Sequence, residues 1–283
     1  MDCRLNVLFT GRGTSGSWQC RGVQLGGRIG TVKPRAKLQD MLEHDLIVLV
    51  KRPAPGQIDA IRKSGKPWVW DVVDFYPQPE CTRWDRDKAI SWVRKQIKSF
   101  NPTGVVWPNA KMQADCGGGP SECVVYHHHR IDIAANPIRD NVSTVGYEGS
   151  ERYLGRWGKA IKAECKARGW EFAVNKGVHA DWDICVAFRD DAFNGYAQKH
   201  WKSNVKLANC HGSGTPFIGP REHGYLETLT GRELFVDSQS EISAAFDALE
   251  PLAVRRIISH DFLFSRLSID SVVRKYSDYL RAL

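Results

Sequence analysis

Short runs of consecutive apolar residues, each followed by a helix-like segment, recur through the first half of the chain. These runs are hydrophobic at every position rather than at alternate positions, which is typical of strands covered by helices on both faces. Strands of this kind form parallel sheets. We therefore predict a parallel sheet with strands at 5–9, 46–50, 68–74, 104–108 and 123–126, and helices that include 57–64 and 85–100.

The same alternation starts again after a short polar segment, 136–141, which has the composition of a linker. Two successive alternations predict the α/β class, with two Rossmann-like doubly wound domains facing each other across a cleft. We place the N-terminal domain at 1–137, the C-terminal domain at 138–264, and a last helix at 265–283 that packs back towards the N-terminal domain. In the second half the predicted strands are 142–146, 170–174, 184–188, 216–218 and 233–236, and the predicted helices are 151–168, 196–211, 240–249 and 254–283.

The composition, 42% hydrophobic and 25% charged, is that of a soluble globular protein. No apolar run reaches the roughly 18 residues that span a bilayer, and no signal-peptide core is present, so we expect a cytoplasmic protein without stable membrane insertion. The eight cysteines are expected to be reduced. Cys116 and Cys123 form one loose pair where a zinc knuckle needs two close pairs, so no metal site is predicted.

The 283-residue chain carries a formal net charge of +8. A surplus of Lys and Arg suits a polyanionic partner, such as nucleotide phosphates, DNA or a membrane surface. Simple solubility is the alternative, and the charge by itself leaves both open.

A glycine-rich loop at 11–17 follows the first predicted strand and precedes a helix. Glycines permit close backbone approach, and N–H groups at a helix start favour an anion, so Gly13, Thr14 and Ser15 are candidate contacts to the phosphates of a donor. The loop lacks the Gly-Lys-Ser/Thr of a P-loop and the acidic residue of the dinucleotide fingerprint. A merely tight turn is the alternative.

The segment 201–218 contains a helix with Lys206, then Gly214, Pro216 and an apolar strand. This order resembles the donor-binding segment of glycosyltransferases with the B-type fold (GT-B). The resemblance implies that Lys206 neutralises the donor diphosphate, and that Asn209 stands where many members carry a ribose-binding Glu. Arg189, after the strand at 184–188, matches a family arginine near the diphosphate.

The resemblance extends to the loops on either side of this segment. Gly149 belongs to a loop like the one that follows the first strand of the family's donor domain, and Glu222 or Glu227 would hold a sugar or ribose hydroxyl. It also implies a nucleotide-sugar donor, UDP-glucose or another UDP-hexose, with no other cofactor and no metal. Fixed cations then stabilise the charge that develops on the leaving diphosphate.

Two carboxylates, Asp71 and Asp74, lie at the end of the third predicted strand, and His127 follows the fifth. All three are candidate catalytic residues: either carboxylate could be the general base that an inverting transfer to a hydroxyl requires or could orient the acceptor, and His127 could contact the acceptor or a phosphate. For the two carboxylates the alternative is a capping role, and for His127 it is a place in a surface loop.

These features predict transfer of a hexosyl group from a nucleotide-sugar to a hydroxyl. Through the segments 11–18, 70–74 and 126–129, the compact, basic chain also resembles phage-encoded transferases. That resemblance implies a 5-hydroxymethylpyrimidine in DNA, such as 5-hydroxymethylcytosine, as the acceptor, and the host cytoplasm as the location. One alternative is a transferase for a surface glycan or lipid-linked acceptor. Another is a non-catalytic module that binds nucleotide or DNA.

Overall fold

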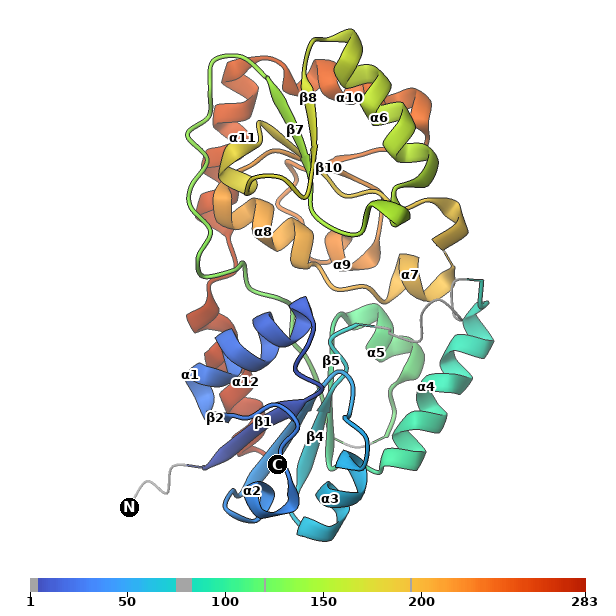
Figure 1. The fold of residues 1–283 in the computed structure, drawn as a ribbon, viewed down its shortest axis with the longest axis vertical. Helices are drawn as coiled ribbons and strands as arrows, with labels where there is room; N and C mark the ends of the chain where they lie inside the picture. Colours follow the sequence, from blue (N-terminus) through green and yellow to red (C-terminus); the bar gives the residue numbers. More distant parts are fainter. Residues whose placement is uncertain (1–4, 75–82, 120, 194) are drawn as a thin grey trace.

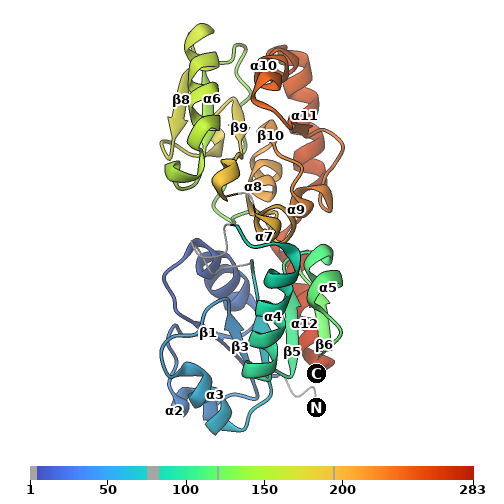
Figure 2. The same cartoon turned by 90° about the vertical axis from the view of Figure 1, so that its right-hand side faces the viewer.

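The chain forms two parallel sheets, one above the other in Figure 1 and turned by 90° in Figure 2. This computed structural model describes residues 5–74, 83–119, 121–193 and 195–283. The six-stranded sheet has the order β2-β1-β3-β4-β5-β6, and the five-stranded sheet has the order β11-β10-β9-β7-β8. The predicted α/β class with two Rossmann-like domains is confirmed.

The N-terminal sheet is built from the apolar runs that the sequence pattern identified. Its strands are β1 (Val7–Gly11), β2 (Thr31–Val32), β3 (Leu46–Val50), β4 (Trp68–Asp71), β5 (Gly104–Trp107) and β6 (Ser121–Val124). Every residue of β1, β3, β4 and β5 is buried, as expected for strands with helices on both faces. Between them lie the π-helix η1 (Trp18–Gly26) and the α-helices α1 (Gly27–Ile29), α2 (Leu38–Leu42), α3 (Gln57–Ser64), α4 (Arg86–Phe100) and α5 (Ala110–Cys116).

The C-terminal sheet and the helices packed on it form a second apolar core. Its strands are β7 (Thr144–Tyr147), β8 (Glu171–Val174), β9 (Ile184–Val186), β10 (Phe217–Gly219) and β11 (Leu234–Phe235). The helices are α6 (Gly155–Ala167), α7 (Tyr196–His200), α8 (Val205–Ser213), α9 (His223–Leu226), α10 (Ile242–Leu249), α11 (Leu252–Ser265) and α12 (Ile269–Arg281). Short 3-10 turns are η2 (Glu151–Tyr153), η3 (His179–Asp181), η4 (Asp191–Phe193) and η5 (Gln239–Glu241).

The helix predicted at 196–211 is two helices, α7 and α8, with a non-helical break between them. Asn109, from the other domain, donates from Nδ2 to the backbone carbonyls of His200 and Lys202, both at 3.0 Å. Asn204 bonds both the N–H and the carbonyl of His127. The Asn109 contacts take carbonyls that a continuous helix would use itself, and Asn204 fixes the break to the other domain through its side chain.

The tail predicted as one helix is also divided, because Ser268 starts a new helix by accepting the N–H of Ser271. The resulting helix α12 (red) packs against the N-terminal sheet, where the rings of Phe9 and Tyr276 lie 5.9 Å apart (Figure 1). The short helix α7 likewise packs into the N-terminal core through Ala197 and Trp201. Among the described helices, none combines the length and the apolar character needed to cross a bilayer.

Candidate active site

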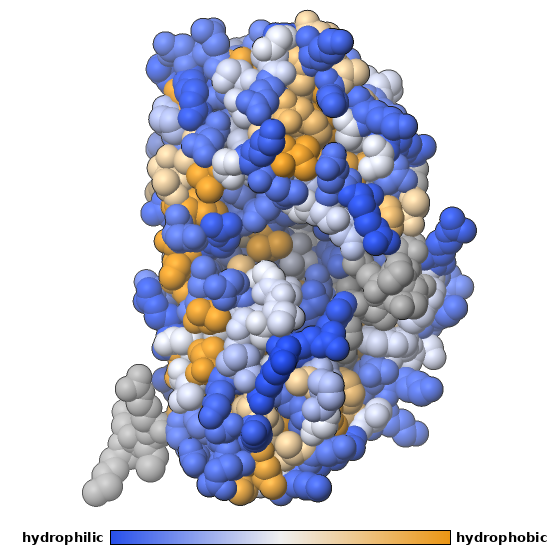
Figure 3. Space-filling view, viewed as in Figure 1, coloured by the Kyte–Doolittle hydropathy of each residue, from blue (hydrophilic) through white to orange (hydrophobic). Residues whose placement is uncertain are grey.

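Several of the predicted site residues lie just beyond the carboxyl ends of parallel strands. Asp74 and His127 follow β4 and β6 in one sheet, and Gly149 and Arg189 follow β7 and β9 in the other. Open parallel sheets bind ligands at these ends. Hydrophilic side chains border the junction of the two domains on the face shown in Figure 3. We take this junction as the candidate site.

On the C-terminal side, Arg189 forms an ion pair with Glu222, and both side chains are largely buried. Glu222 uses Oε1 for this pair, and its Oε2 has no hydrogen-bond partner among the described residues. The nearby carboxylate raises the pKa of Arg189 despite its burial, so the guanidinium stays charged. The pair therefore offers a fixed cation and a free carboxylate oxygen.

Lys206, near the start of α8, lies close to this pair. Its Nζ is 4.2 Å from the centre of the Tyr147 ring, a cation–π contact. Burial, and then the positive charge of Arg189, lower the pKa of Lys206 to about 8. A second cation is thus held next to the first, with no ion pair of its own in the described part of the chain, which favours an anionic ligand.

Gly149 permits this close approach. Its φ of +145° is a conformation that side chains rarely adopt, and a Cβ there would lie 3.3 Å from Lys206 Nζ. However, its N–H already donates to Asn175 Oδ1 at 2.9 Å, and its carbonyl accepts from Asn175 Nδ2. Gly149 therefore shapes the cluster, while its amide is not free to bind a phosphate.

Asn209 and Glu227 are occupied in other contacts, so the donor-binding roles expected for them are not supported. Asn209 accepts the N–H of Arg130 at 3.1 Å and donates to Glu148 at 3.4 Å. The Glu227 carboxylate accepts the N–H groups of Ala110 and Lys111, at 2.7 and 2.9 Å, and so caps α5 of the other domain. Both residues join the two domains, a role that sequence position alone does not reveal.

Asp74 lies at the centre of an ionic chain across the junction. Its two oxygens are 2.6 Å from Lys51 Nζ and 3.3 Å from Lys202 Nζ, and Lys51 also donates to Ser17 at 3.1 Å. The two ammonium groups outweigh the effect of burial and hold the pKa of Asp74 below its ordinary value. Asp74 is therefore ionised and suited to fixing the two lysines in place.

His127 lies beside this chain as a neutral imidazole. Its side chain is buried, and the pKa is lowered well below the ordinary value by burial and then by the charge of Arg21. Nδ1 has no hydrogen-bond partner among the described residues. Asn204 fixes the backbone of His127. The site thus holds a ring nitrogen that no other described group engages.

Asp71 is directed away from the junction, contrary to the expectation that it acts there as a base. Its carboxylate is 1% exposed, accepts the Tyr276 hydroxyl of α12 at 3.0 Å and lies 3.9 Å from Arg21 Nε. Burial raises the pKa of Asp71. Its neighbours indicate a structural role, joining α12 to the sheet.

Gly13, Thr14 and Ser15 line a cavity of about 260 Å³ together with Lys51 and Arg52. Gly13 has a φ of +81°, and a Cβ there would meet Pro34 at 2.5 Å, so the loop requires glycine. The cavity belongs to the N-terminal domain, and Lys51 connects it to Asp74. The loop therefore lies with the Asp74 chain, whereas Arg189 and Lys206 belong to the opposite domain.

Lys51 and Lys202 are site residues that sequence reasoning did not select. Lys51 follows β3 directly, so the rule that pointed to Asp74 and His127 also points to it. Lys202 lies in the break between α7 and α8, inside a segment expected to be helical. Its position depends on contacts from the other domain and has no local signal.

No family model matches the sequence, and no curated protein sequence matches it. Solved structures do. AviGT4, a glycosyltransferase involved in avilamycin A biosynthesis, matches with a TM-score of 0.59 and 11% identity, over 99% of this chain and 98% of AviGT4. Staphylococcus aureus TarM, in a complex that contains UDP, gives 0.57 and 8% over 82% of this chain and 55% of TarM.

The GtfA/B complex gives a TM-score of 0.51 and 9% identity, and there the match covers 87% of this chain and 59% of the other. This chain thus spans little more than half the length of TarM and of the GtfA/B chain, but almost the whole of AviGT4. At these identities the similarity concerns the fold. The two parallel-sheet domains have the GT-B fold.

Proposed function

We propose that this protein is a glycosyltransferase that moves a sugar from a nucleotide diphosphate to a hydroxyl acceptor. The observation that carries the proposal is the cluster of Arg189, Lys206 and Glu222 at the carboxyl ends of β9 and β10 and the start of α8. The GT-B fold and its match over the full length of AviGT4 support it.

In this proposal the two cations act on the leaving group. Cleavage of the sugar–phosphate bond places negative charge on the departing diphosphate, and preorganised cations stabilise that charge as it develops. Arg189 is held in place by its ion pair with Glu222 Oε1. Lys206 is held by the Tyr147 ring, and the missing side chain of Gly149 leaves room for its ammonium group. Glu222 Oε2, which is free, accepts a hydroxyl of the donor ribose or sugar.

On the acceptor side we assign the general base to His127. Its Nδ1, which has no hydrogen-bond partner among the described residues, can take the proton of the attacking hydroxyl, and the charge of Asp74 favours the imidazolium that forms. Asp74 positions Lys51 and Lys202 next to His127. The glycine-rich loop, with Gly13, Thr14 and Ser15, contributes the adjoining wall.

For the donor we propose UDP-glucose or another UDP-hexose. The structurally similar TarM complex contains UDP, and the two cations fit any nucleoside diphosphate. Isothermal titration calorimetry with UDP, TDP, GDP and ADP separates these bases directly. If the protein bound another nucleoside diphosphate more tightly than UDP, the proposed donor would change, but the proposed reaction, sugar transfer, would not.

For the acceptor we propose a 5-hydroxymethylpyrimidine in phage DNA, modified in the host cytoplasm. The formal net charge of +8 supports an anionic partner. Arg12, Arg35 and Lys37 also line a cavity of about 730 Å³ on the N-terminal domain, beside the glycine-rich loop. Phosphate groups next to the target base would contact these side chains.

The test is transfer of radiolabel from UDP-glucose to 5-hydroxymethylcytosine DNA, with unmodified DNA and a glycan acceptor in parallel. Lys206→Ala and Arg189→Ala should each lose turnover by a factor of about 10²–10³, whereas Lys166→Ala, on the exposed end of α6, should not. If only the glycan became labelled, the DNA acceptor would be wrong and a glycan would take its place in the proposal. Tight UDP binding with no transfer to any acceptor would indicate a non-catalytic module.

A further inference from the structure

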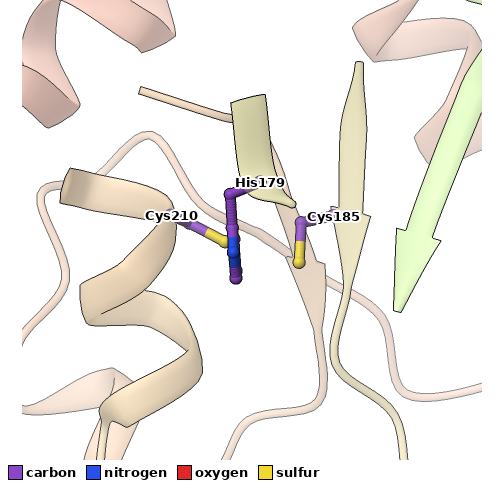
Figure 4. A group of neighbouring side chains, drawn as sticks. All are labelled: His179, Cys185 and Cys210. Atoms are coloured by element: carbon purple, nitrogen blue, oxygen red, sulfur yellow. The ribbon is translucent and has the colours of Figure 1, made fainter. Parts of the chain in front are cut away.

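Three side chains capable of binding a metal meet inside the C-terminal domain. His179 comes from η3, Cys185 from β9 and Cys210 from α8, and one ligand atom from each lies within 4.8 Å of the others. Figure 4 shows the imidazole between the two cysteine side chains. The three residues are 3%, 1% and 0% exposed, in the same order. Together they make a buried set of one nitrogen and two sulfur ligands.

The backbone around these ligands is fixed by the surrounding structure. The carbonyl of His179 accepts the Thr215 hydroxyl at 2.8 Å and Asn136 Nδ2 at 3.3 Å. Cys185 lies on β9, which pairs with β10 on one side and β7 on the other. Cys210 lies within α8. The three ligands therefore lie on elements whose backbone positions are already fixed by hydrogen bonds of the protein itself.

His179 has an unsatisfied nitrogen within this cluster. Its Nε2 is buried and has no hydrogen-bond partner among the described residues. Buried polar atoms are normally paired, and an orphaned one requires an explanation. The nearest carboxylate oxygen, Glu148 Oε2, is 3.8 Å away, too far for a hydrogen bond. An ion between the two atoms would satisfy both.

We propose that His179, Cys185 and Cys210, with Glu148 as the fourth ligand, bind one Zn²⁺ ion. Two sulfur ligands with one imidazole and one carboxylate favour zinc in a tetrahedral site. With Zn–S bonds of about 2.3 Å and Zn–N bonds of about 2.0 Å, neighbouring ligand atoms stand about 3.3–3.8 Å apart. The separations among the ligand atoms of His179, Cys185 and Cys210 exceed that range by about 1 Å at most, and Glu148 Oε2 lies 3.8 Å from His179 Nε2.

The site also has a route from solvent. A cavity of about 240 Å³ is lined by His179 and Glu148, together with Arg130, Asn175 and Trp182. Arg130 and Asn209 contact the Glu148 carboxylate, each at 3.4 Å. Outer contacts of this kind orient a ligating group. The ion would join the Glu148 loop to β9 and α8, the helix that carries Lys206.

The first measurement is the metal content of the purified chain by inductively coupled plasma mass spectrometry. We expect close to one equivalent of zinc per chain. Exchange for Co²⁺ should give the thiolate-to-cobalt charge-transfer band and the intense visible bands of a tetrahedral site. A chain that takes up neither zinc nor cobalt after exposure to each ion would overturn the proposal.

Variants identify the ligands. Cys210→Ser and His179→Ala should each weaken zinc binding at least tenfold, measured by competition with a chromophoric chelator. Cys165→Ser removes another buried thiol of the same domain and should retain the ion. Should Cys210→Ser fail to fold, intact mass of the unaltered chain decides: a loss of two hydrogens, with Cys185 linked to Cys210, would contradict the zinc site. None of these measurements depends on sugar transfer.

Discussion

Asp74 Oδ2 and Lys202 Nζ lie 3.3 Å apart across the junction of the two domains. Since Asp74 also binds Lys51, one carboxylate is shared by two ammonium groups, one from each domain. The chain of charges therefore links the strand ends of the N-terminal sheet to the segment that leads into α8, where the proposed donor-binding Lys206 lies.

Replacing Asp74 by Asn should remove the carboxylate that pairs with both Lys51 and Lys202. Removing one partner of a largely buried ion pair costs about 3 kcal/mol, and we expect a decrease of that size in the free energy of unfolding. Urea denaturation followed by circular dichroism measures it. The matched control is Asp59→Asn, whose pair with Arg62 is exposed, and for which a change within about 0.5 kcal/mol is expected.

Affinity for UDP should depend on pH through Lys206. Because the pKa of Lys206 is lowered to about 8 and a diphosphate binds the protonated form, binding should weaken as pH rises through that value, by up to about tenfold per unit above it. Calorimetry at pH 7, 8 and 9 checks the slope. Lys206→Arg keeps its charge over this range and should flatten the curve, and an equally flat curve for the unaltered chain would contradict the assignment.

Glu222→Gln should raise the KM for the donor. The change removes the charge that holds Arg189 and weakens the acceptor at Oε2, two charge-assisted contacts of the kind worth about 1.5–3 kcal/mol each, so at least a tenfold increase is expected. Steady-state kinetics with varied UDP-sugar measures it. Glu171→Gln, on the exposed part of β8, should leave KM unchanged. An unchanged KM in Glu222→Gln would remove this residue from the donor site.

Tyr276→Phe separates a structural role of Asp71 from a catalytic one. Loss of the hydroxyl leaves the buried Asp71 carboxylate with one hydrogen bond fewer, at a cost of about 1–3 kcal/mol in the free energy of unfolding. We expect kcat to stay within about twofold, since Asp71 lies away from the junction. A large fall in kcat with little loss of stability would indicate that Asp71 has a catalytic role.

His127→Asn should lower kcat while leaving UDP affinity unchanged. Among the described residues the imidazole Nδ1 has no hydrogen-bond partner, so we expect its removal to affect proton transfer, worth a factor of about 10²–10⁴. His260→Asn, on the exposed face of α11, is the control. If UDP affinity fell in parallel with kcat, His127 would be acting on binding.

The sequence allowed the fold to be predicted because each strand carries its own local signal. Runs such as 46–50 are apolar at every position, and only a sheet covered on both faces accommodates them. The same reasoning placed Asp74, His127 and Arg189 correctly at strand ends. It also led to Asp71, because the pattern does not show on which side of β4 a side chain is covered. Here α12, some 200 residues further along the chain, covers it.

Other features of the site depend on contacts between distant segments. Glu227 caps a helix more than 100 residues away, and Asn109 interrupts a helix more than 90 residues away. The cysteines of the proposed zinc site are separated by 24 intervening residues, far from the close spacing that makes a zinc motif readable. Such pairings follow from the assembled fold, and no local pattern of residues encodes them.

The position of α12 bears on how the two domains can move against each other. The polypeptide passes between the domains at the segment around Asn136, again on either side of α7, and a last time before α12. A rotation of one domain against the other must therefore bend the backbone at all of these passages together. We expect hinge bending to be restricted to axes that run close to every one of these passages, which favours a small rotation of the domains over their wide separation.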